Sequence, residues 1–279
     1  MSAVAIIGMA RSSGSKRLGS TPFVHVPGIN PAKFSMNQAA RTAARESIVL
    51  LKNDGNLLPL DKSKLKRVAV IGPNASRSLN GNDNGDPTHS VTVLEGIEHE
   101  LGPAVPVDCP GRPPDLQVRR GPRRPGLLSE GGRHRPSGRP HPLRRRPDTQ
   151  LEGEESNYES PGFSHGDRTR IELPEAQDKL LKALQATGKP VIFINCSGSA
   201  IAMPWEAQNI PAILQAWYPG GEAGTAVAEV LFGKYNPSGC LPVTFYASTV
   251  DLPDFDDYRM ANRTYRYSKE SLSSPSDTD

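Results

Sequence analysis

Apolar residues recur along the chain with two spacings, one typical of helices and the other typical of buried strands. The first helical stripe starts near Asn37 and places apolar residues on one side of a helix. Its members are Ala39, Ala40, Ala43, Ala44, Ile48 and Leu51. The stripe predicts a helix that stops at the turn Asn53-Asp54-Gly55, because these residue types tolerate the backbone conformation that ends helices.

Short β-branched runs and amphipathic stretches alternate along the rest of the chain. The predicted strands lie within residues 67–75, 103–108, 189–200 and 241–246. The predicted helices lie within residues 92–101 and 173–188, and residues 212–233 combine a strand, a glycine-rich turn and a helix. Such alternation is typical of α/β proteins, so the sequence predicts a three-layer α/β/α sandwich with a mostly parallel sheet.

One helix and one central strand are missing from this alternation. After residues 103–108 the pattern requires both before the acidic cluster that begins at Glu152. Residues 111–148 occupy that place, and they are rich in arginine, proline, glycine and histidine with almost no periodic apolar positions. We therefore expect an irregular tract that interrupts the sandwich.

The same tract accounts for the positive charge of the chain. It holds eleven arginines and three acidic residues, a local +8, whereas the whole chain carries +3 and the remainder is therefore at −5. The tract contains no lysine and no aromatic residue on which a nucleotide base could stack. The charge pattern therefore argues against a nucleic-acid partner.

The remaining composition argues against several other classes of protein. The cysteines Cys109, Cys196 and Cys240 form neither a CxxC nor a Cys/His spacing, so we expect no disulfide framework, no metal site and no cofactor. The apolar run at residues 2–10 is too short for a signal peptide or a membrane span. We expect a soluble chain without a visible export signal or a membrane partner, and its compartment stays open.

Several long motifs resemble those of a known family. They are "AARESIVLLKNDGNLLPL", "VAVIGPNA", "GDRTRIELPEAQDKLLKALQATGKPVIFINCSGSAIAMPW", "AILQAWYPGGEAGTAVAEVLFGKYNPSGCLPVTFY" and "NRTYRY". Together they resemble the C-terminal α/β sandwich domain of family 3 glycoside hydrolases, in the bacterial β-xylosidase and β-glucosidase branch. The resemblance implies that residues 37–267 form the sandwich, that residues 1–36 are a linker or remnant of a missing N-terminal barrel domain, and that residues 268–279 are a disordered tail.

The resemblance also implies a function, the removal of terminal β-D-xylosyl or β-D-glucosyl residues from β-linked oligosaccharides or aryl glycosides. A retaining glycosidase needs one carboxylate as nucleophile and another as acid and then base. By resemblance, the nucleophile is an aspartate of the missing barrel domain, and the acid/base lies in the loop "LEGEE", residues 151–155. Glu152, followed by Gly153, best matches the Glu-Gly pair of the family, and Glu154 is the alternative.

Other interpretations stay open at this point. An acidic loop such as residues 151–155 is often merely solvated, and the sandwich would then be a non-catalytic carbohydrate- or partner-binding module or an inactive gene product. The turn at residues 218–224 resembles a phosphate-binding turn but lacks the full GxGxxG spacing, which favours close packing instead. Trp205 and Trp217 are more often core residues than platforms for sugar rings.

The family pattern suggests why the arginine-rich tract is irregular. Relatives carry a strand similar to "AADLVIFVGGLTP" directly before "LEGEE". When Arg135–Asp148 is written with suitable codons and read one nucleotide later, it gives "ARAADLIPFVGGL". The family's continuation "YFKGEPLFPFGYG", with one nucleotide deleted, likewise gives the residues from Tyr267 to Asp279 at every position. Our hypothesis is that both segments are translated out of frame.

The DNA sequence of codons 104–150 tests this hypothesis. We expect a single-nucleotide shift before the tract and a compensating shift near Thr149, so that the alternative frame encodes an apolar strand followed by two glycines. A gene in which that frame contains stop codons or encodes no apolar run would contradict the hypothesis.

Overall fold

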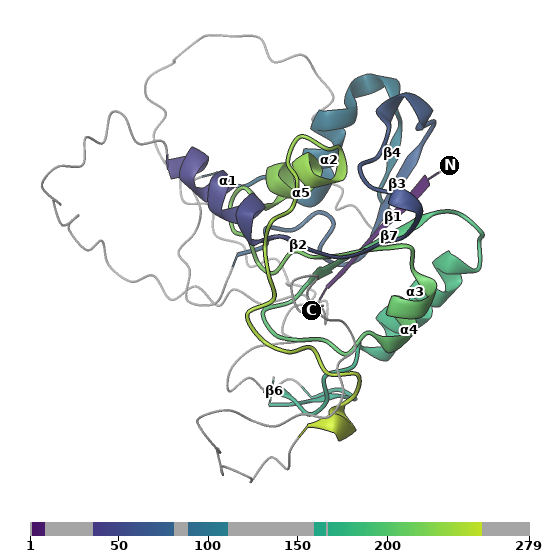
Figure 1. The fold of residues 1–279 in the computed structure, drawn as a ribbon, viewed down its shortest axis with the longest axis vertical. Coiled ribbons are helices and arrows are strands. Elements are labelled where there is room, and N and C mark those ends of the chain that lie inside the picture. The colour runs from purple at the N-terminus through teal and green to yellow at the C-terminus, as the bar shows by residue number, and fades with distance from the viewer. Residues whose placement is uncertain (1, 9–35, 81–88, 111–158, 166, 253–279) are drawn as a thin grey trace, which may run out of the picture.

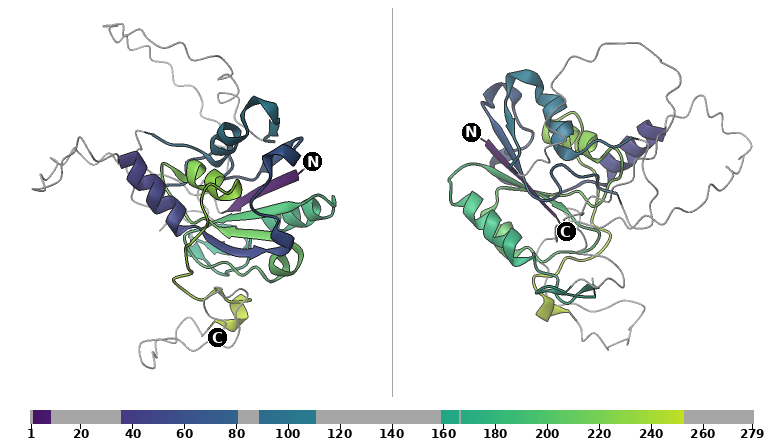
Figure 2. Two further views of the ribbon diagram at one scale, coloured as in Figure 1. Left: turned by 45° about the horizontal axis from the view of Figure 1, so that its top comes forward. Right: turned by 180° about the vertical axis from the view of Figure 1, so that it is seen from behind.

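A computed structural model describes residues 2–8, 36–80, 89–110, 159–165 and 167–252, which build one central sheet between two layers of helices (Figures 1 and 2). The sheet has the strand order β2-β8-β7-β1-β3-β4. The strands are β1 Ser2–Gly8, β2 Val49–Asn53, β3 Val68–Ile71, β4 Val107–Asp108, β7 Val191–Cys196 and β8 Ala212–Gln215. All neighbours are parallel except β2 and β8, so the prediction of a mostly parallel sheet is confirmed.

The helices divide between the two faces of the sheet (Figure 1). One layer contains α1 Met36–Ser47, α2 Val93–Leu101 and α5 Ala223–Leu231, and the other contains α3 Glu175–Gln185 and α4 Pro204–Asn209. Strand β7 serves both layers because successive side chains point to opposite faces. Ile192 and Ile194 pack in the core of the first layer, whereas Val191 and Phe193 pack in the core of the second. This arrangement is the predicted three-layer sandwich.

Strand β1 is an addition to the predicted architecture. The resemblance implies that residues 1–36 are a linker or remnant of a missing N-terminal barrel domain, and the structure places Ser2–Gly8 in the middle of the sheet between β7 and β3. Residues 9–35 lie outside the described part of the chain. The arginine-rich tract at residues 111–148 and the tail at residues 268–279 lie outside it as well, so their irregularity stays a prediction.

The first predicted helix is too long by several residues. Helix α1 ends at Ser47, and the apolar residues after Ile48 form β2, which pairs antiparallel with β8. The indole nitrogen Nε1 of Trp217 donates to the carbonyl of Ser47, and the amide of Gly239 donates to the carbonyl of Ile48. Contacts that are distant in sequence therefore override the helical stripe, because the edge of β8 pairs with Val49–Asn53.

The prediction of a last strand at residues 241–246 is wrong. The segment forms no strand in the structure, and Pro242 has no backbone N–H to donate to a ladder. Phe245 is nevertheless fully buried, with its ring edge-on to Trp217 at a centroid distance of 6.2 Å. The apolar pattern of this segment reflects the burial of Phe245 and not a strand.

The start of α2 follows the sequence closely. The side-chain oxygen of Thr92 accepts a hydrogen bond from the amide of Glu95, and the Glu95 carboxylate accepts one from the amide of Thr92. This reciprocal pair is a capping box. It satisfies amide groups at the start of the helix, which have no carbonyl partner in a preceding turn. It fixes the point at which α2 starts, as the sequence predicted near Thr92.

Helices α2 and α5 cross with their backbones nearly in contact. A Cβ atom added at Gly96 would lie 2.0 Å from the carbonyl oxygen of Gly224, and one added at Gly224 would lie 1.9 Å from that of Thr92. Neither neighbour is a flexible side chain that moves aside easily. The crossing therefore requires glycine on both helices.

We expect Gly96→Ala to destabilise the protein by about 1–3 kcal/mol, because the methyl group overpacks a backbone contact. In an exposed helix the same change would stabilise by about 1 kcal/mol. The measurement is the urea midpoint, with His99→Ala on the exposed side of α2 as a control that should stay within about 0.5 kcal/mol of the parent. A neutral or stabilising Gly96→Ala would show that the two helices are further apart.

Candidate functional site

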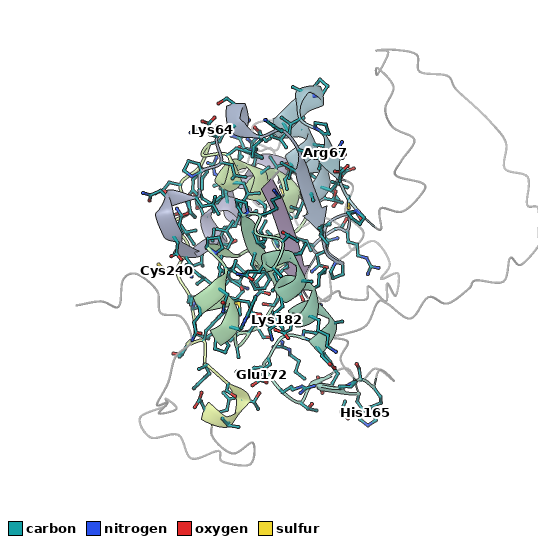
Figure 3. The ribbon with its side chains drawn as sticks, turned by 90° about the vertical axis from the view of Figure 1, so that its right-hand side faces the viewer. Lys64, Arg67, His165, Glu172, Lys182 and Cys240 are labelled. Atoms are coloured by element: carbon teal, nitrogen blue, oxygen red, sulfur yellow. The ribbon has the colours of Figure 1, made fainter. Side chains whose placement is uncertain are left out.

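The parallel strands bring their carboxyl ends to one edge of the sheet, which is where ligand sites of such sheets lie. The loops that leave β7 and β8 emerge there, at residues 197–200 and 216–221. In Figure 3, Arg67 precedes β3 and lies at one end of the molecule, whereas Glu172 and His165 lie at the other. The second end, formed by the strand ends and the segment around residues 159–172, is the candidate site.

A hairpin is fastened to this edge. It consists of β5 Phe163–Ser164 and β6 Asp167–Arg168. The guanidinium Nη1 of Arg168 donates to the carbonyl oxygen of Ala200 at 3.1 Å, so the hairpin is held against the loop that leaves β7. Asp167 is exposed, and Pro174 occupies the cap position of α3, so Asp167 does not cap that helix.

The two predicted acid/base candidates, Glu152 and Glu154, lie outside the described residues. The structure therefore neither brings them together with other groups nor separates them. The first carboxylate after them in the described chain is that of Glu159, whose Oε1 accepts a hydrogen bond from the amide of His165 at 2.8 Å. Glu159 thus closes the hairpin turn.

A buried polar network lies at the ends of β7 and β8. The side-chain nitrogen Nδ2 of Asn195 donates to Gln215 Oε1 at 2.6 Å and to Ser197 Oγ at 2.9 Å. Ser197 Oγ donates in turn to the carbonyl oxygen of Ser199 at 2.8 Å. All three side chains of the network are inaccessible to solvent, and nothing in the described chain donates to Asn195 Oδ1.

The network links the sheet to the hairpin. It fixes the backbone from Ser197 to Ser199, and Arg168 contacts the next residue, Ala200. The sequence analysis did not single out Asn195 or Gln215. A polar residue inside the otherwise apolar run "VIFINC" was the available signal, because a buried amide needs hydrogen-bond partners.

Trp217 holds the loop after β8 in an unusual conformation. Its φ angle of 58° is in the left-handed region, which bulky residues rarely adopt. The indole Nε1 donates to the carbonyl of Ser47 at 2.9 Å, and the ring packs edge-on against Phe245. Trp205 packs against the second core with the ammonium group of Lys182 over its ring. These contacts place both tryptophans in structural roles.

The glycine-rich turn serves packing, as the sequence analysis favoured. The amide of Gly220 donates to the carbonyl of Leu79, and the amide of Gly224 donates to the carbonyl of Val91. A Cβ atom at Gly221 would lie 2.7 Å from the carbonyl oxygen of His89. Amide groups that would cradle a phosphate are thus already bound to the neighbouring loop.

Glu172 binds the segment that follows the sandwich core. Its carboxylate accepts hydrogen bonds from Ser248 Oγ at 2.9 Å, from the Thr249 amide at 2.9 Å and from Thr249 Oγ1 at 2.7 Å. Partial burial by itself would raise the pKa of Glu172. The hydrogen bonds from Thr249 and Ser248 outweigh that effect and lower the pKa to about 2. We call this arrangement the Glu172 clamp.

In the described part of the chain, no cluster of three histidine, cysteine or acidic side chains is arranged to hold a metal ion. Within the same residues, no helix has both the length and the apolar character required to cross a membrane. A surface hollow of about 420 Å³ lies at the amino end of β7, between Asp54, Lys189 and Asn209, and so away from the candidate site.

Comparison with known proteins identifies the family of these elements. The sequence profile described as "Glycosyl hydrolase family 3 C-terminal domain" matches residues 48–274. The chain is 60% identical over 122 residues to a xylan 1,4-β-xylosidase of Xylanibacter ruminicola. The aligned region covers 44% of this chain and 14% of that protein. It is also 34% identical over 242 residues to a β-xylosidase of Formosa agariphila. That aligned region covers 79% of this chain and 31% of the relative.

Solved structures give the same result. A β-glucosidase from Erythrobacter marinus matches 83% of this chain and 33% of its own chain, with 29% identity and a TM-score of 0.56. A family 3 β-glucosidase from Bifidobacterium adolescentis matches 83% and 32%, with 26% identity and a TM-score of 0.56. The chain thus spans about a third or less of the length of these relatives.

The Glu172 clamp predicts how stability changes in acid. Because the folded-state pKa of about 2 lies below the ordinary 4.5, the clamp stabilises the fold above pH 4.5, and this contribution is lost as the pH falls toward 2. Glu172→Gln should therefore lower the melting temperature at pH 7 and flatten its decline between pH 4.5 and 2. Thermal unfolding measured from pH 2 to 7 checks this.

Glu46→Gln is the matched control for that measurement. It neutralises an exposed carboxylate of α1 without touching the clamp, so the decline in acid should keep the slope of the parent protein. If the melting temperatures of Glu172→Gln and the parent declined in parallel as the pH falls, the clamp would not form in solution.

Proposed function

The chain belongs to the family 3 glycoside hydrolases as their C-terminal domain, and on that premise we propose that it is the second-domain part of a retaining exo-β-glycosidase. The reaction is hydrolysis of terminal β-D-xylosyl or β-D-glucosyl residues. The match over residues 48–274 is the observation that supports this most strongly. Relatives named β-xylosidase and β-glucosidase support the same class of substrate.

The proposed acid/base is Glu152, with Glu154 as the alternative. Both residues belong to the loop 151–155, and the hairpin that begins at Phe163 follows this loop closely in the chain. Arg168 fastens that hairpin beside the end of β7, at the edge of the sheet where ligand sites lie. The short distance in sequence between the loop and this hairpin supports a role of the loop in the active site.

The proposed mechanism divides the work between two domains. An aspartate of the barrel domain attacks the anomeric carbon, while Glu152 donates a proton to the oxygen of the leaving group. Glu152 then accepts a proton from the water that hydrolyses the glycosyl-enzyme intermediate. For the first step Glu152 has to be protonated, which burial against the barrel and a nearby nucleophile carboxylate would favour by raising its pKa.

The test uses a gene in which both frames are restored and the barrel domain is present. We expect Glu152→Ala to reduce kcat/KM for glycosides with poor leaving groups by about 10²–10⁴. Activated aryl glycosides need less protonation, so their first step should be spared, and azide should accelerate the breakdown of the intermediate. Glu154→Ala is the matched variant and should show neither effect.

If Glu154→Ala shows this signature and Glu152→Ala does not, the two roles are exchanged; if neither does, the loop does not supply the acid/base. The chain by itself is the baseline and should not turn over 4-nitrophenyl β-D-xyloside or β-D-glucoside, because the proposed nucleophile belongs to the barrel domain. Turnover at about 1 s⁻¹ or faster that survives the double change Glu152→Gln and Glu154→Gln would contradict the two-domain mechanism.

A further inference from the structure

Strand β1 lies in the interior of the sheet, where the backbone groups along both of its edges need partners. It has a parallel neighbour on both edges, with six register pairs to β7, from Ala3 opposite Val191 to Gly8 opposite Cys196. On its other edge it makes four register pairs with β3, from Ser2 opposite Val68 to Ala5 opposite Ile71. Removing β1 would therefore split the sheet into β2-β8-β7 and β3-β4.

The neighbouring strands are not suited to an open edge. Every residue of β7 is buried, and so are Val68 and Val70 of β3. Unpaired amide and carbonyl groups in such an environment are costly, because neither water nor another strand satisfies them. The space between β7 and β3 therefore requires an extended segment that pairs on both sides.

The connections of β1 are also unusual for a central parallel strand. Such strands are normally joined to a neighbour by a short right-handed crossover. Here the chain passes from β1 to α1 and then to β2 at the far edge, before it returns to β3, and β7 follows more than a hundred residues later. Along the chain, residues 9–35 separate β1 from α1, and neither of its neighbours in the sheet is adjacent to it in the sequence.

We propose that the space between β7 and β3 is a strand-acceptor groove and that Ser2–Gly8 is a separable ligand of it. The groove binds an extended, parallel peptide of small and β-branched residues. The interaction is β-strand addition, in which main-chain hydrogen bonds give affinity and alternate side chains give selectivity. The sequence of the occupant, "SAVAIIG", consists entirely of small and β-branched residues.

The occupant is the strand of the same chain and not that of a second copy. The strand and the groove belong to one covalent chain, and intramolecular binding of this kind typically has an effective concentration of about millimolar. A second copy at micromolar concentration competes poorly with such a tethered strand. The groove itself does not depend on the glycosidase proposal, because it follows from pairings within the sheet.

The test cuts the tether in the full-length protein. A specific protease sequence is inserted between Gly14 and Ser15, and the cleaved protein is passed over a gel-filtration column. We expect the amino-terminal fragment to elute with the rest of the chain and to be displaced by an excess of a synthetic peptide that carries residues 2–8. A peptide with proline at the position of Ala5 should displace at least tenfold less, because it cannot pair on both edges.

Strand-breaking variants provide a second readout. Ala5→Pro in the full chain should raise the hydrogen-exchange rates of β3 and β7 at least tenfold, and adding the wild-type peptide should restore protection. Ser2→Pro is the control, because proline is tolerated at the first residue of a strand.

Three results would overturn the proposal. The first is release of the fragment on cleavage alone. The second is an Ala5→Pro variant whose β3 and β7 amides are either unchanged or not rescued by the peptide. The third is a dimer of the uncut chain at micromolar concentration that the peptide converts to monomers, because this would assign the groove to the strand of a second copy.

Discussion

A buried parallel strand needs hydrogen-bond partners along both of its edges, and the pairing of β7 satisfies this need with β8 on one side and β1 on the other. The side chains of β7 also supply both hydrophobic cores, since Ile192 and Ile194 face one helical layer and Val191 and Phe193 face the other. Both helical layers of the described chain therefore pack against a strand whose pairing depends on Ser2–Gly8.

The same strand arrangement positions the candidate site. Because β7 and β8 are parallel and in register, Asn195 and Gln215 lie side by side, and their amides form one buried network with Ser197. The network fixes the turn that Arg168 contacts, and Arg168 belongs to the hairpin that follows the acidic loop. Polar contacts thus connect the core of the sheet to the hairpin that follows the proposed acid/base loop in the sequence.

Sequence reasoning succeeded where the determining contacts are local. Thr92 and Glu95 are three residues apart and fix the start of α2, and the glycine-rich turn could be assigned to packing from its spacing. It failed for Val49–Asn53, where the open edge of β8, far away in the sequence, decided for strand over helix.

Two other features depend on partners that local sequence does not reveal. The run Ser2–Gly8 is short, and its neighbours in the sheet begin only at Val68 and Val191. Local sequence therefore does not identify it as a strand of this sheet. The polar residue Asn195 was visible inside an apolar run, but its partner Gln215 belongs to another strand. Glu152 and Glu154 lie outside the described residues, so for them the family motif remains the only guide.

Native-state hydrogen exchange of the unmodified chain tests most directly whether Ser2–Gly8 completes the sheet. The amides of Val4, Ala5 and Ile6 should exchange as slowly as those of Ile192–Ile194, within about a factor of ten, because strands in one cooperative unit open together. Exchange of Ser2–Gly8 at the rate of an unstructured peptide, while β7 and β3 stay protected, would contradict the account.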